Sequence, residues 1–389
     1  MAERAVPLPP GRPLAGRRIT EVLATSTGGV GTHLRSVLPA LLDAGAAVQV
    51  CGPRATDELF GFAAAGAEFT PVEISAGLDP PADTRAVRAL RAALAGADLV
   101  HAHGLRAGLV TVAARRLGRA RPPLVLTLHN ALPEGGGARR RVLQVAERAT
   151  VRGADIVLAA SGDLAANARR LGAPDVRSAP VSAPPLPPAR RDRAAVRAEL
   201  GLADGRPLVV AVGRLHPQKG YDVLLDAAAR WTADSRLPAV PLVAVAGDGP
   251  LADELAARVR AERLPVALLG RRGDVADLLA AADLCVLPSR WEARSLTAQE
   301  ALRSGTPLVA TRTGGLPELL GDAAELVPVG DAAALADAAV RVLTDPGRAR
   351  ELVAAGRRQA QGWPDEAGTA RQLVAVYREL LGPSPSGAA

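Results

Sequence analysis

The sequence alternates short apolar runs of strand length with longer segments of helical period that are rich in Ala, Arg and Leu. Alternating strands and helices build parallel sheets, because two parallel strands need a long crossover between them. The alternation breaks once, in the Pro-rich stretch 174–188, and then restarts. The sequence therefore predicts an α/β chain of two parallel-sheet domains joined by a Pro-rich linker. The expected strands are 19–25, 46–51, 98–101, 124–128 and 155–160, followed by 208–212, 242–246, 266–269, 284–287 and 307–310.

Composition limits the class of protein and its compartment. The 389 residues are 48% hydrophobic, enough for large cores, yet no apolar run approaches the ~18 residues of a membrane span. Residues 1–16 lack the apolar core of a signal peptide. The two cysteines, Cys51 and Cys285, are far apart, which argues against a disulfide framework or a zinc module. We therefore expect a cytoplasmic protein.

The net charge of +7 invites two binding hypotheses. Nucleic acid is not expected as a partner, because aromatic residues for base stacking make up only 2% of the chain and the arginines are spread over Ala-rich helical stretches. The segment 138–152 is basic and partly amphipathic. It is either an ordinary solvated helix or a peripheral contact with the inner face of the cytoplasmic membrane.

The common nucleotide-binding motifs are incomplete. The loop 28–34, GGVGTHL, lacks the third glycine of a dinucleotide fingerprint, and the second strand ends at Cys51 and Gly52 without an acidic residue for a ribose. A P-loop needs Gly-Lys-Ser/Thr, which does not occur in the chain. The G-x-S-x-G motif that carries the nucleophile of many hydrolases does not occur either. What remains is a group of glycines before a helix, which either forms a tight turn or lets backbone N–H groups approach an anion.

Lys219 is the only lysine among 47 basic residues, and it lies in the loop 213–220, GRLHPQKG, between a strand and a helix. A cation at a helix start is unfavourable, because the helix dipole is positive there. Arg214 and Lys219 in this place make sense if an anion lies between them. The alternative is ordinary surface charge. The position of the sole lysine favours a phosphate site.

Two carboxylates follow in the segment 288–300, PSRWEARSLTAQE. Glu292 and Glu300 are eight positions apart. Thr297 and Glu300 have the spacing of a helix capping box, whereas Glu292 has only a possible ion pair with Arg290 or Arg294 as a structural explanation. The first amides of the following helix would form a second anion site. These are Ser295, Leu296 and Thr297.

These motifs resemble those of the retaining glycosyltransferases of family 4, the glycosyl transferases group 1, in order and spacing. The second half carries G-R-L-x-x-x-K-G at 213–220, A-G-D-G-P-L at 246–251, the Glu-x7-Glu pair, and 305–318. The first half has looser matches, at 28–33, 101–104, 127–129 and Ser161, and Trp363 matches near the end.

The resemblance implies a GT-B fold, that is, two doubly wound Rossmann-like domains that face each other across a cleft. A flexible start, an acceptor-side domain, a donor domain, a helix that crosses back to the first domain, and a disordered tail are expected. Their ranges are 1–16, 17–186, 187–362, 363–382 and 383–389.

The resemblance also implies roles for individual residues. Arg214 and Lys219 would bind the donor diphosphate, Glu300 the nucleotide ribose, and Glu292 the hydroxyls of the donor sugar. His129 would face the reacting sugar, whereas His101 and His103 could as readily be packing residues. The implied backbone contacts to the donor are at Gly29, Gly31, Gly213, Gly270, Arg271, Ser295, Leu296 and Thr297.

The implied activity is transfer of a hexose-type sugar from a nucleoside diphosphate sugar, with retention of anomeric configuration and without a metal or other cofactor. The acceptor could be a glycan, a lipid-linked molecule or a small molecule. A GT-B phosphorylase or epimerase, and a nucleotide-sugar-binding protein without turnover, remain alternatives. The chain departs from the family pattern at Ala293-Arg294, where the family has Gly, Pro or an aromatic residue, and at 180–184, where it lacks the usual P-x-G-V-D.

Overall fold

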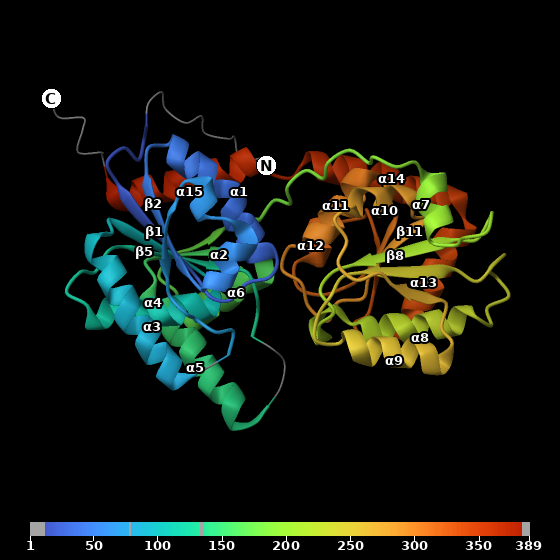
Figure 1. Ribbon diagram of the computed structural model, residues 1–389, viewed down its shortest axis with the longest axis horizontal. Helices are drawn as coiled ribbons and strands as arrows, with labels where there is room; N and C mark the ends of the chain where they lie inside the picture. The colour runs from blue at the N-terminus through green and yellow to red at the C-terminus, as the bar shows by residue number, and fades with distance from the viewer. Residues whose placement is uncertain (1–11, 78, 133–135, 383–389) are drawn as a thin grey trace. The chain divides into compact units, whose positions relative to one another are not determined.

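A computed structural model describes residues 12–77, 79–132 and 136–382. The chain divides into two compact units, residues 1–182 with 364–389, and residues 183–363 (Figure 1). Of the segments predicted to be flexible, residues 1–11 and 383–389 lie outside the described residues, whereas residues 12–16 are described. Within that stretch Leu14 is 1% exposed, and its amide donates to the Ala44 carbonyl at 2.8 Å. The first domain therefore begins a few residues earlier than the sequence predicts.

The first unit contains a 7-stranded parallel sheet in the order β3-β2-β1-β4-β5-β6-β7. The two central strands, Leu99–His103 and Leu124–Leu128, are buried along their whole length, as expected of a sheet covered by helices on both faces. The strands are β1 (Arg18–Leu23), β2 (Ala47–Gly52), β3 (Glu68–Pro71), β4 (Leu99–His103), β5 (Leu124–Leu128), β6 (Ile156–Ala159) and β7 (Val176–Ser178).

The helices of the first unit follow the strands as crossover connections. One of them, at the end of the chain, returns to this unit. The α-helices are α1 (Gly29–Asp43), α2 (Arg54–Phe60), α3 (Pro80–Ala93), α4 (Gly104–Leu117), α5 (Gly137–Gly153), α6 (Gly162–Leu171) and α15 (Glu366–Leu381), with 3-10 turns η1 (Ala63–Ala65) and η2 (Leu94–Gly96).

The C-terminal helix α15 is a structural part of the first unit, where it lies beside α1 (Figure 1, red). Its residues Leu373, Val374 and Tyr377 are buried in the same core as Ile19 and Leu23 of β1. Burying these side chains offsets the entropy of ordering a segment far from the first unit in sequence.

The second unit contains a 6-stranded parallel sheet in the order β10-β9-β8-β11-β12-β13. Val209 and Ala211 of its central strand pack against helices on one face, and Leu208 and Val210 against helices on the other, because side chains alternate along a strand. The strands are β8 (Leu208–Val212), β9 (Leu242–Ala246), β10 (Val266–Leu268), β11 (Leu284–Leu287), β12 (Leu308–Thr311) and β13 (Glu325–Val327).

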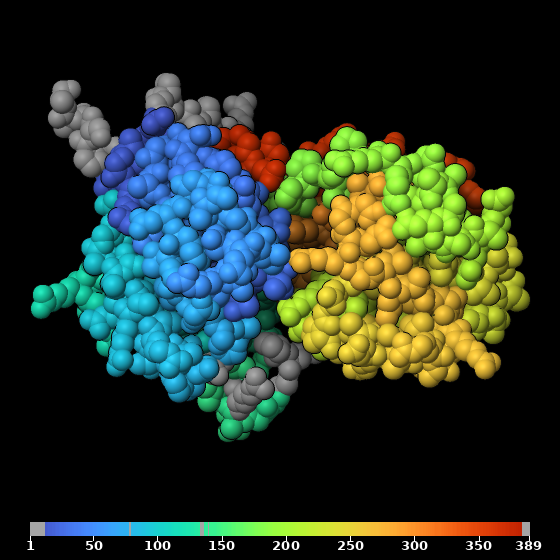
Figure 2. Space-filling view, in the orientation of Figure 1, coloured from blue at the N-terminus to red at the C-terminus, as the bar shows by residue number. Residues whose placement is uncertain are grey.

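Helices cover both faces of this sheet, so the unit is doubly wound. Helix α9 has Leu255 as its only buried residue, and its side chains form part of the exposed surface in Figure 2. The helices are α7 (Arg193–Glu199), α8 (Tyr221–Trp231), α9 (Ala252–Glu262), α10 (Val275–Ala281), α11 (Leu296–Ser304), α12 (Leu316–Leu320), α13 (Ala332–Thr344) and α14 (Pro346–Gln361), with the 3-10 turn η3 (Pro217–Lys219).

Both sheets have a point where the strand order reverses. The chain runs outward from β1 to β3 and then continues at β4 beside β1. In the second unit it runs outward from β8 to β10 and continues at β11 beside β8. Ligands of open α/β sheets bind at the carboxyl ends of the strands at such a switch point. The loops after β1, β4, β8 and β11 are therefore the places to examine.

No helix within the described residues is long and apolar enough to cross a membrane.

Candidate functional site

The loops that follow β8 and β11 are hydrogen-bonded to each other at the switch point of the second unit. The Arg290 amide donates to the Gln218 carbonyl at 2.7 Å, and the Gln218 side-chain amide donates to the Trp291 carbonyl at 2.9 Å. Gly220 makes this approach possible, since a Cβ there would lie 2.1 Å from the Pro288 carbonyl oxygen. The two loops thus form one rigid platform that carries Lys219 and Glu292.

Lys219 and Glu292 form an ion pair on this platform. The Nζ of Lys219 lies 2.6 Å from Oε1 of Glu292, and the Ser289 hydroxyl donates to the same oxygen at 2.7 Å. The side chain of Glu292 is only 8% exposed, and that of Lys219 is 21% exposed. The structure therefore joins two residues that the sequence singles out separately, one for the diphosphate and one for the donor sugar.

The loop after β12 supports Glu292 from behind. The Gly315 amide donates to the Glu292 carbonyl at 2.9 Å, and a Cβ on Gly314 would lie 2.0 Å from that carbonyl oxygen. Gly314 has a φ of +51°, a left-handed conformation that favours glycine. This explains physically why a glycine stands at 314 in the segment that resembles the family.

Arg214 and Lys219 place two positive charges at the same loop. Arg214 is exposed, and His216 lies between the two in sequence. Burial lowers the pKa of His216, and the charges of Arg214 and Lys219 lower it further, as expected of a ring that lies near both cations. Gly213, whose carbonyl accepts from the Tyr221 hydroxyl at 3.0 Å, begins this loop.

Helix α11 begins at Leu296 with Ser295 as its N-cap. The Ser295 hydroxyl accepts from the Ala298 amide at 3.3 Å. The predicted capping box of Thr297 and Glu300 is therefore wrong, because Thr297 lies inside the helix and its hydroxyl donates to the Val212 carbonyl instead, at 3.3 Å. The helix N-terminus still offers its first amides, including those of Leu296 and Thr297, next to the platform.

Glu300 lies one turn into α11 and lines a pocket of about 310 Å³. Its carboxylate makes no hydrogen bond or ion pair within the described residues. Burial raises the pKa of Glu300, and Arg303 offsets this only in part. The protein thus keeps a half-buried carboxylate unpartnered, at a cost in stability. The other lining residues are Pro184, Pro185, Leu186, Pro187, Pro188, Ala189, Ala276, Ala280, Arg303 and Ser304.

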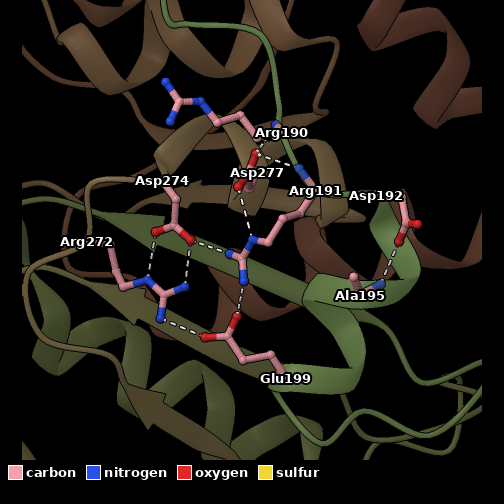
Figure 3. A network of polar contacts seen from close by, with 8 residues as sticks. All are labelled: Arg190, Arg191, Asp192, Ala195, Glu199, Arg272, Asp274 and Asp277. Carbon is pink, nitrogen blue, oxygen red and sulfur yellow. Dashed lines mark hydrogen bonds and ion pairs between the residues drawn. The ribbon is translucent and has the colours of Figure 1, made fainter.

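The loop expected to bind the nucleotide base is anchored on one side. Gly270 and Arg271 are exposed. Arg272, by contrast, is fixed by Asp274, with its Nε 2.7 Å from Oδ1, and by Glu199 at 2.9 Å (Figure 3). Arg191, just after the Pro-rich linker, extends this network to Asp274, Glu199 and Asp277. The loop and the linker therefore share one set of ion pairs.

The departure at Ala293-Arg294 has a local explanation. The Arg294 guanidinium lies 5.7 Å from the ring centre of Trp363, and that of Arg303 lies at the same distance. Burial lowers the pKa of Arg294 to about 10. Arg294 therefore stacks on an aromatic ring within the second unit, where the family commonly has a Gly, a Pro or an aromatic residue.

In the first unit, the glycines of the loop after β1 differ in their surroundings. Gly29 is the exposed first residue of α1. Gly31 is buried, its amide donates to the Ser26 hydroxyl at 3.2 Å, and a Cβ there would lie 2.2 Å from the Phe60 ring. The absence of a side chain at Gly31 thus serves packing between α1 and α2.

Four of the five histidines gather behind this loop, around Glu21. The His103 Nε2 lies 2.8 Å from Oε2 of Glu21, and the His103 Nδ1 lies 3.3 Å from Nε2 of His129. His101 lies 2.6 Å from the Tyr377 hydroxyl, which donates to Glu21 at 2.8 Å. His33, on α1, completes the group, with its ring centre 5.5 Å from that of His129.

This group was only partly visible in the sequence, where His129 is assigned a site role and His101 and His103 are left as possible packing residues. All of its members except His33 lie in strands, at a strand end, or in α15. Glu21 lies in the middle of an apolar run of the sequence. An acidic residue at that position is the signal that could have indicated a buried polar group. Tyr377 could not be connected to it without knowledge of how the chain returns.

Glu21, His101 and His103 are also the residues that could hold a metal ion, since one donor atom from each lies within 4.8 Å of the others. All three are fully buried or nearly so. Each of these donor atoms already takes part in a hydrogen bond with another member of the group. Hydrogen bonding alone therefore accounts for the arrangement.

Comparison with known proteins identifies both units. Residues 28–184 match the glycosyl transferase 4-like domain, and residues 206–345 match the glycosyl transferases group 1. D-inositol 3-phosphate glycosyltransferase of Nocardia farcinica is 34% identical over 307 residues, which are 73% of this chain and 67% of that protein. The enzyme of that name from Mycobacterium tuberculosis is 34% identical over 314 residues, 73% of this chain and 62% of its own length.

Solved structures confirm the predicted fold class of two Rossmann-like parallel-sheet domains. Sucrose-phosphate synthase from Thermosynechococcus elongatus has a TM-score of 0.75 at 24% identity and covers 94% of this chain and 99% of its own. Anabaena Alr3699/HepE, solved in complex with UDP-glucose, has a TM-score of 0.76 at 22% identity, with 93% and 99% covered. Together with the domain matches, these similarities show that the chain belongs to the group 1 glycosyltransferases, family 4, of the GT-B fold.

Proposed function

We propose that the chain transfers a hexose-type sugar from a nucleoside diphosphate sugar to an acceptor, with retention of anomeric configuration. The observation that carries this proposal is the ion pair of Lys219 with the buried Glu292 at the switch point of the second unit. A cation and a carboxylate side by side suit a ligand that joins phosphate oxygens to sugar hydroxyls. Similar solved structures contain UDP or UDP-glucose, which supports the donor class.

The second unit supplies the groups for departure of the diphosphate. Lys219, Arg214 and the first amides of α11, at Ser295, Leu296 and Thr297, would stabilise negative charge as it grows on the leaving phosphate. This stabilisation needs no bound metal. Glu292 would accept hydrogen bonds from hydroxyls of the donor sugar, and His129 of the first unit would contact the reacting sugar.

Glu300 fits the proposed ribose contact because its carboxylate is unpartnered and lines a pocket. A ribose offers two hydroxyl donors, and two hydrogen bonds to one carboxylate would replace the missing partners. Backbone groups of Gly270 and Arg271 would contact the base. This geometry does not select uracil, guanine or adenine.

The experiment is a transfer assay with glucose donors of uridine, guanosine and adenosine diphosphate, followed by NMR analysis of the anomeric configuration of the product. D-inositol 3-phosphate is the first acceptor to test, because relatives are named for it. If inorganic phosphate is required and a free sugar phosphate is released, the result would favour a phosphorylase. If the only product is the donor with inverted configuration at one sugar carbon, it would favour an epimerase. Saturable donor binding without any conversion would favour a binding protein.

A second proposal concerns the membrane, and it rests on one face of α5. Val142 and Val145 are 56% and 70% exposed, and Arg141 and Arg148 are exposed beside them. Spacings of three and four residues place these four side chains on one side of the helix. Apolar side chains flanked by cations suit the surface of an anionic bilayer. Sedimentation with anionic vesicles tests this, and no co-sedimentation would leave α5 as a solvated helix.

A further inference from the structure

The buried polar group of the first unit follows from the alternation of side chains along three neighbouring strands. Ile19 and Leu23 of β1, Leu99 of β4 and Val125 of β5 all point into the core that α1 and α15 cover. Side chains two residues apart share a face. Steps of two along each strand lead to polar residues on this same face. Glu21 lies between Ile19 and Leu23 in β1, His101 and His103 follow Leu99 in β4, and Thr127 follows Val125 in β5. These polar side chains are therefore placed in that same core.

The carboxylate fixes which neighbours are donors. Three polar side chains meet the buried carboxylate of Glu21: the Tyr377 hydroxyl lies 2.8 Å from Oε1, and His103 Nε2 and His101 Nδ1 lie 2.8 Å and 3.3 Å from Oε2. Hydrogen-bond donors around a carboxyl group favour its ionised form. An ionised carboxylate only accepts hydrogen bonds. The Tyr377 hydroxyl must therefore donate to Oε1, at 2.8 Å, and His103 must carry a proton on the Nε2 that lies 2.8 Å from Oε2.

The proton on Nε2 of His103 determines the state of the next ring. His103 and His129 are buried against each other, and burial disfavours a charged imidazolium, so both rings are treated as neutral. A neutral imidazole has one donor and one acceptor. The Nδ1 of His103 is thus an acceptor, and the Nε2 of His129, 3.3 Å away, is the donor to it.

We propose that Glu21 and His103 are positioning residues that hold His129 with its proton on Nε2 and its Nδ1 free to accept a hydrogen bond from a substrate hydroxyl. The chain of contacts is carboxylate to imidazole to imidazole, and it belongs wholly to the first unit. The functional half of this inference rests on the proposed transferase activity, whereas the assignment of the protons does not.

Tyr377 gives a control within the same group. It bonds to the other oxygen of Glu21 and to His101, not to His103. Replacing it by phenylalanine removes a buried hydrogen bond to the carboxylate and so lowers stability, but it leaves the contact from Oε2 to His103 in place. Glu21→Gln also lowers stability, but it removes the charge that determines the proton on His103.

The first measurement is NMR of the full chain with 15N-labelled histidine. The chain has five histidines, so single substitutions assign every ring. We expect His103 and His129 to be neutral and protonated on Nε2 in the wild type and in Tyr377→Phe, and to show mixed protonation in Glu21→Gln. A proton on Nδ1 of either ring in the wild type would overturn the proposal. So would stoichiometric Zn²⁺ binding that removes the proton on Nε2 of His103.

The second measurement is transfer kinetics of Glu21→Gln, His129→Asn and the double variant, at temperatures where all are folded. Because Glu21 acts through His129, we expect Glu21→Gln to lower kcat about tenfold or more with donor KM nearly unchanged. The double variant should then be no slower than His129→Asn alone. Independent, multiplying losses would overturn the proposal. If the wild type transfers no sugar, the proposed function fails, while the NMR result still decides the proton assignment.

Discussion

Breaking the ion pair of Lys219 should reduce both stability and donor binding, and the structure separates the two effects. Lys219→Met removes the 2.6 Å contact and leaves Glu292 with only the Ser289 hydroxyl. Exposed pairs contribute about 0–1 kcal/mol, and breaking a buried pair costs about 3–5 kcal/mol. With exposures of 21% and 8%, this pair lies between those limits. We expect a loss of about 2 kcal/mol, or about 4–8 °C in Tm for a unit of this size.

The double variant Lys219→Met with Glu292→Gln tests the origin of that loss. Without its charge, residue 292 no longer needs a cation, so the double variant should recover part of the lost Tm. Lys219→Arg, which keeps the charge, should retain most of the wild-type Tm. It should not restore turnover fully, because a planar guanidinium replaces a compact ammonium.

Donor binding should weaken in Lys219→Met for a separate reason. A charge-assisted hydrogen bond contributes about 1.5–3 kcal/mol, which corresponds to an affinity lower by about 10- to 150-fold for the nucleoside diphosphate. Turnover should fall further, since charge grows on the leaving phosphate. Calorimetry with UDP, GDP and ADP, together with thermal unfolding, measures both effects. Wild-type Tm and wild-type affinity in Lys219→Met would refute the reasoning.

Four further predictions concern stability, metal and membrane. Glu300→Gln should raise the Tm of the ligand-free protein at pH 7, because burial raises the pKa of Glu300 and its ionised form therefore disfavours folding. This gain in Tm should vanish below about pH 4, where the carboxyl group of the wild type is protonated as well. The same substitution should weaken ribose binding. Ser295→Ala should cost about 1 kcal/mol in unfolding free energy, as loss of a helix N-cap does. Excess EDTA should leave transfer unchanged, and activity restored by Mg²⁺ or Mn²⁺ after its loss would contradict this. Val142→Asp with Val145→Asp should abolish binding to anionic vesicles without lowering Tm, because both side chains are exposed; equal binding by wild type and variant would argue against α5 as the contact.

The strands that the sequence does not predict share a physical property. They are β3, β7 and β13, each three or four residues long and each at the edge of a sheet. Edge strands are only partly covered, so their residues need not be apolar, and EFTP or VRS gives no hydrophobic run. The central strands, which helices cover on both faces, were predictable because burial requires continuous apolar residues.

The same argument explains which parts of the site could be predicted. Gly213, Lys219 and Glu292 lie in loops that directly follow predicted strands, so the rule for carboxyl ends reaches them without any knowledge of strand order. That Lys219 and Glu292 touch depends on β11 lying beside β8, and no local pattern contains that information. The N-cap shows a smaller limit: Ser295 and Thr297 are both good caps, and only the start of α11 decides between them.

The group around Glu21 is the strongest case of information that only the fold provides. Its residues come from β1, β4, the end of β5, helix α1 and the last helix, and none of them stands out in the sequence by itself. A buried carboxylate among apolar side chains is costly unless donors meet it. Here the donors come from His103 and from Tyr377, which stand 82 and 356 positions away. Because the contacts from Glu21 through His103 to His129 are buried and each has a partner, we expect the proton on His129 to be fixed by the protein rather than by solvent.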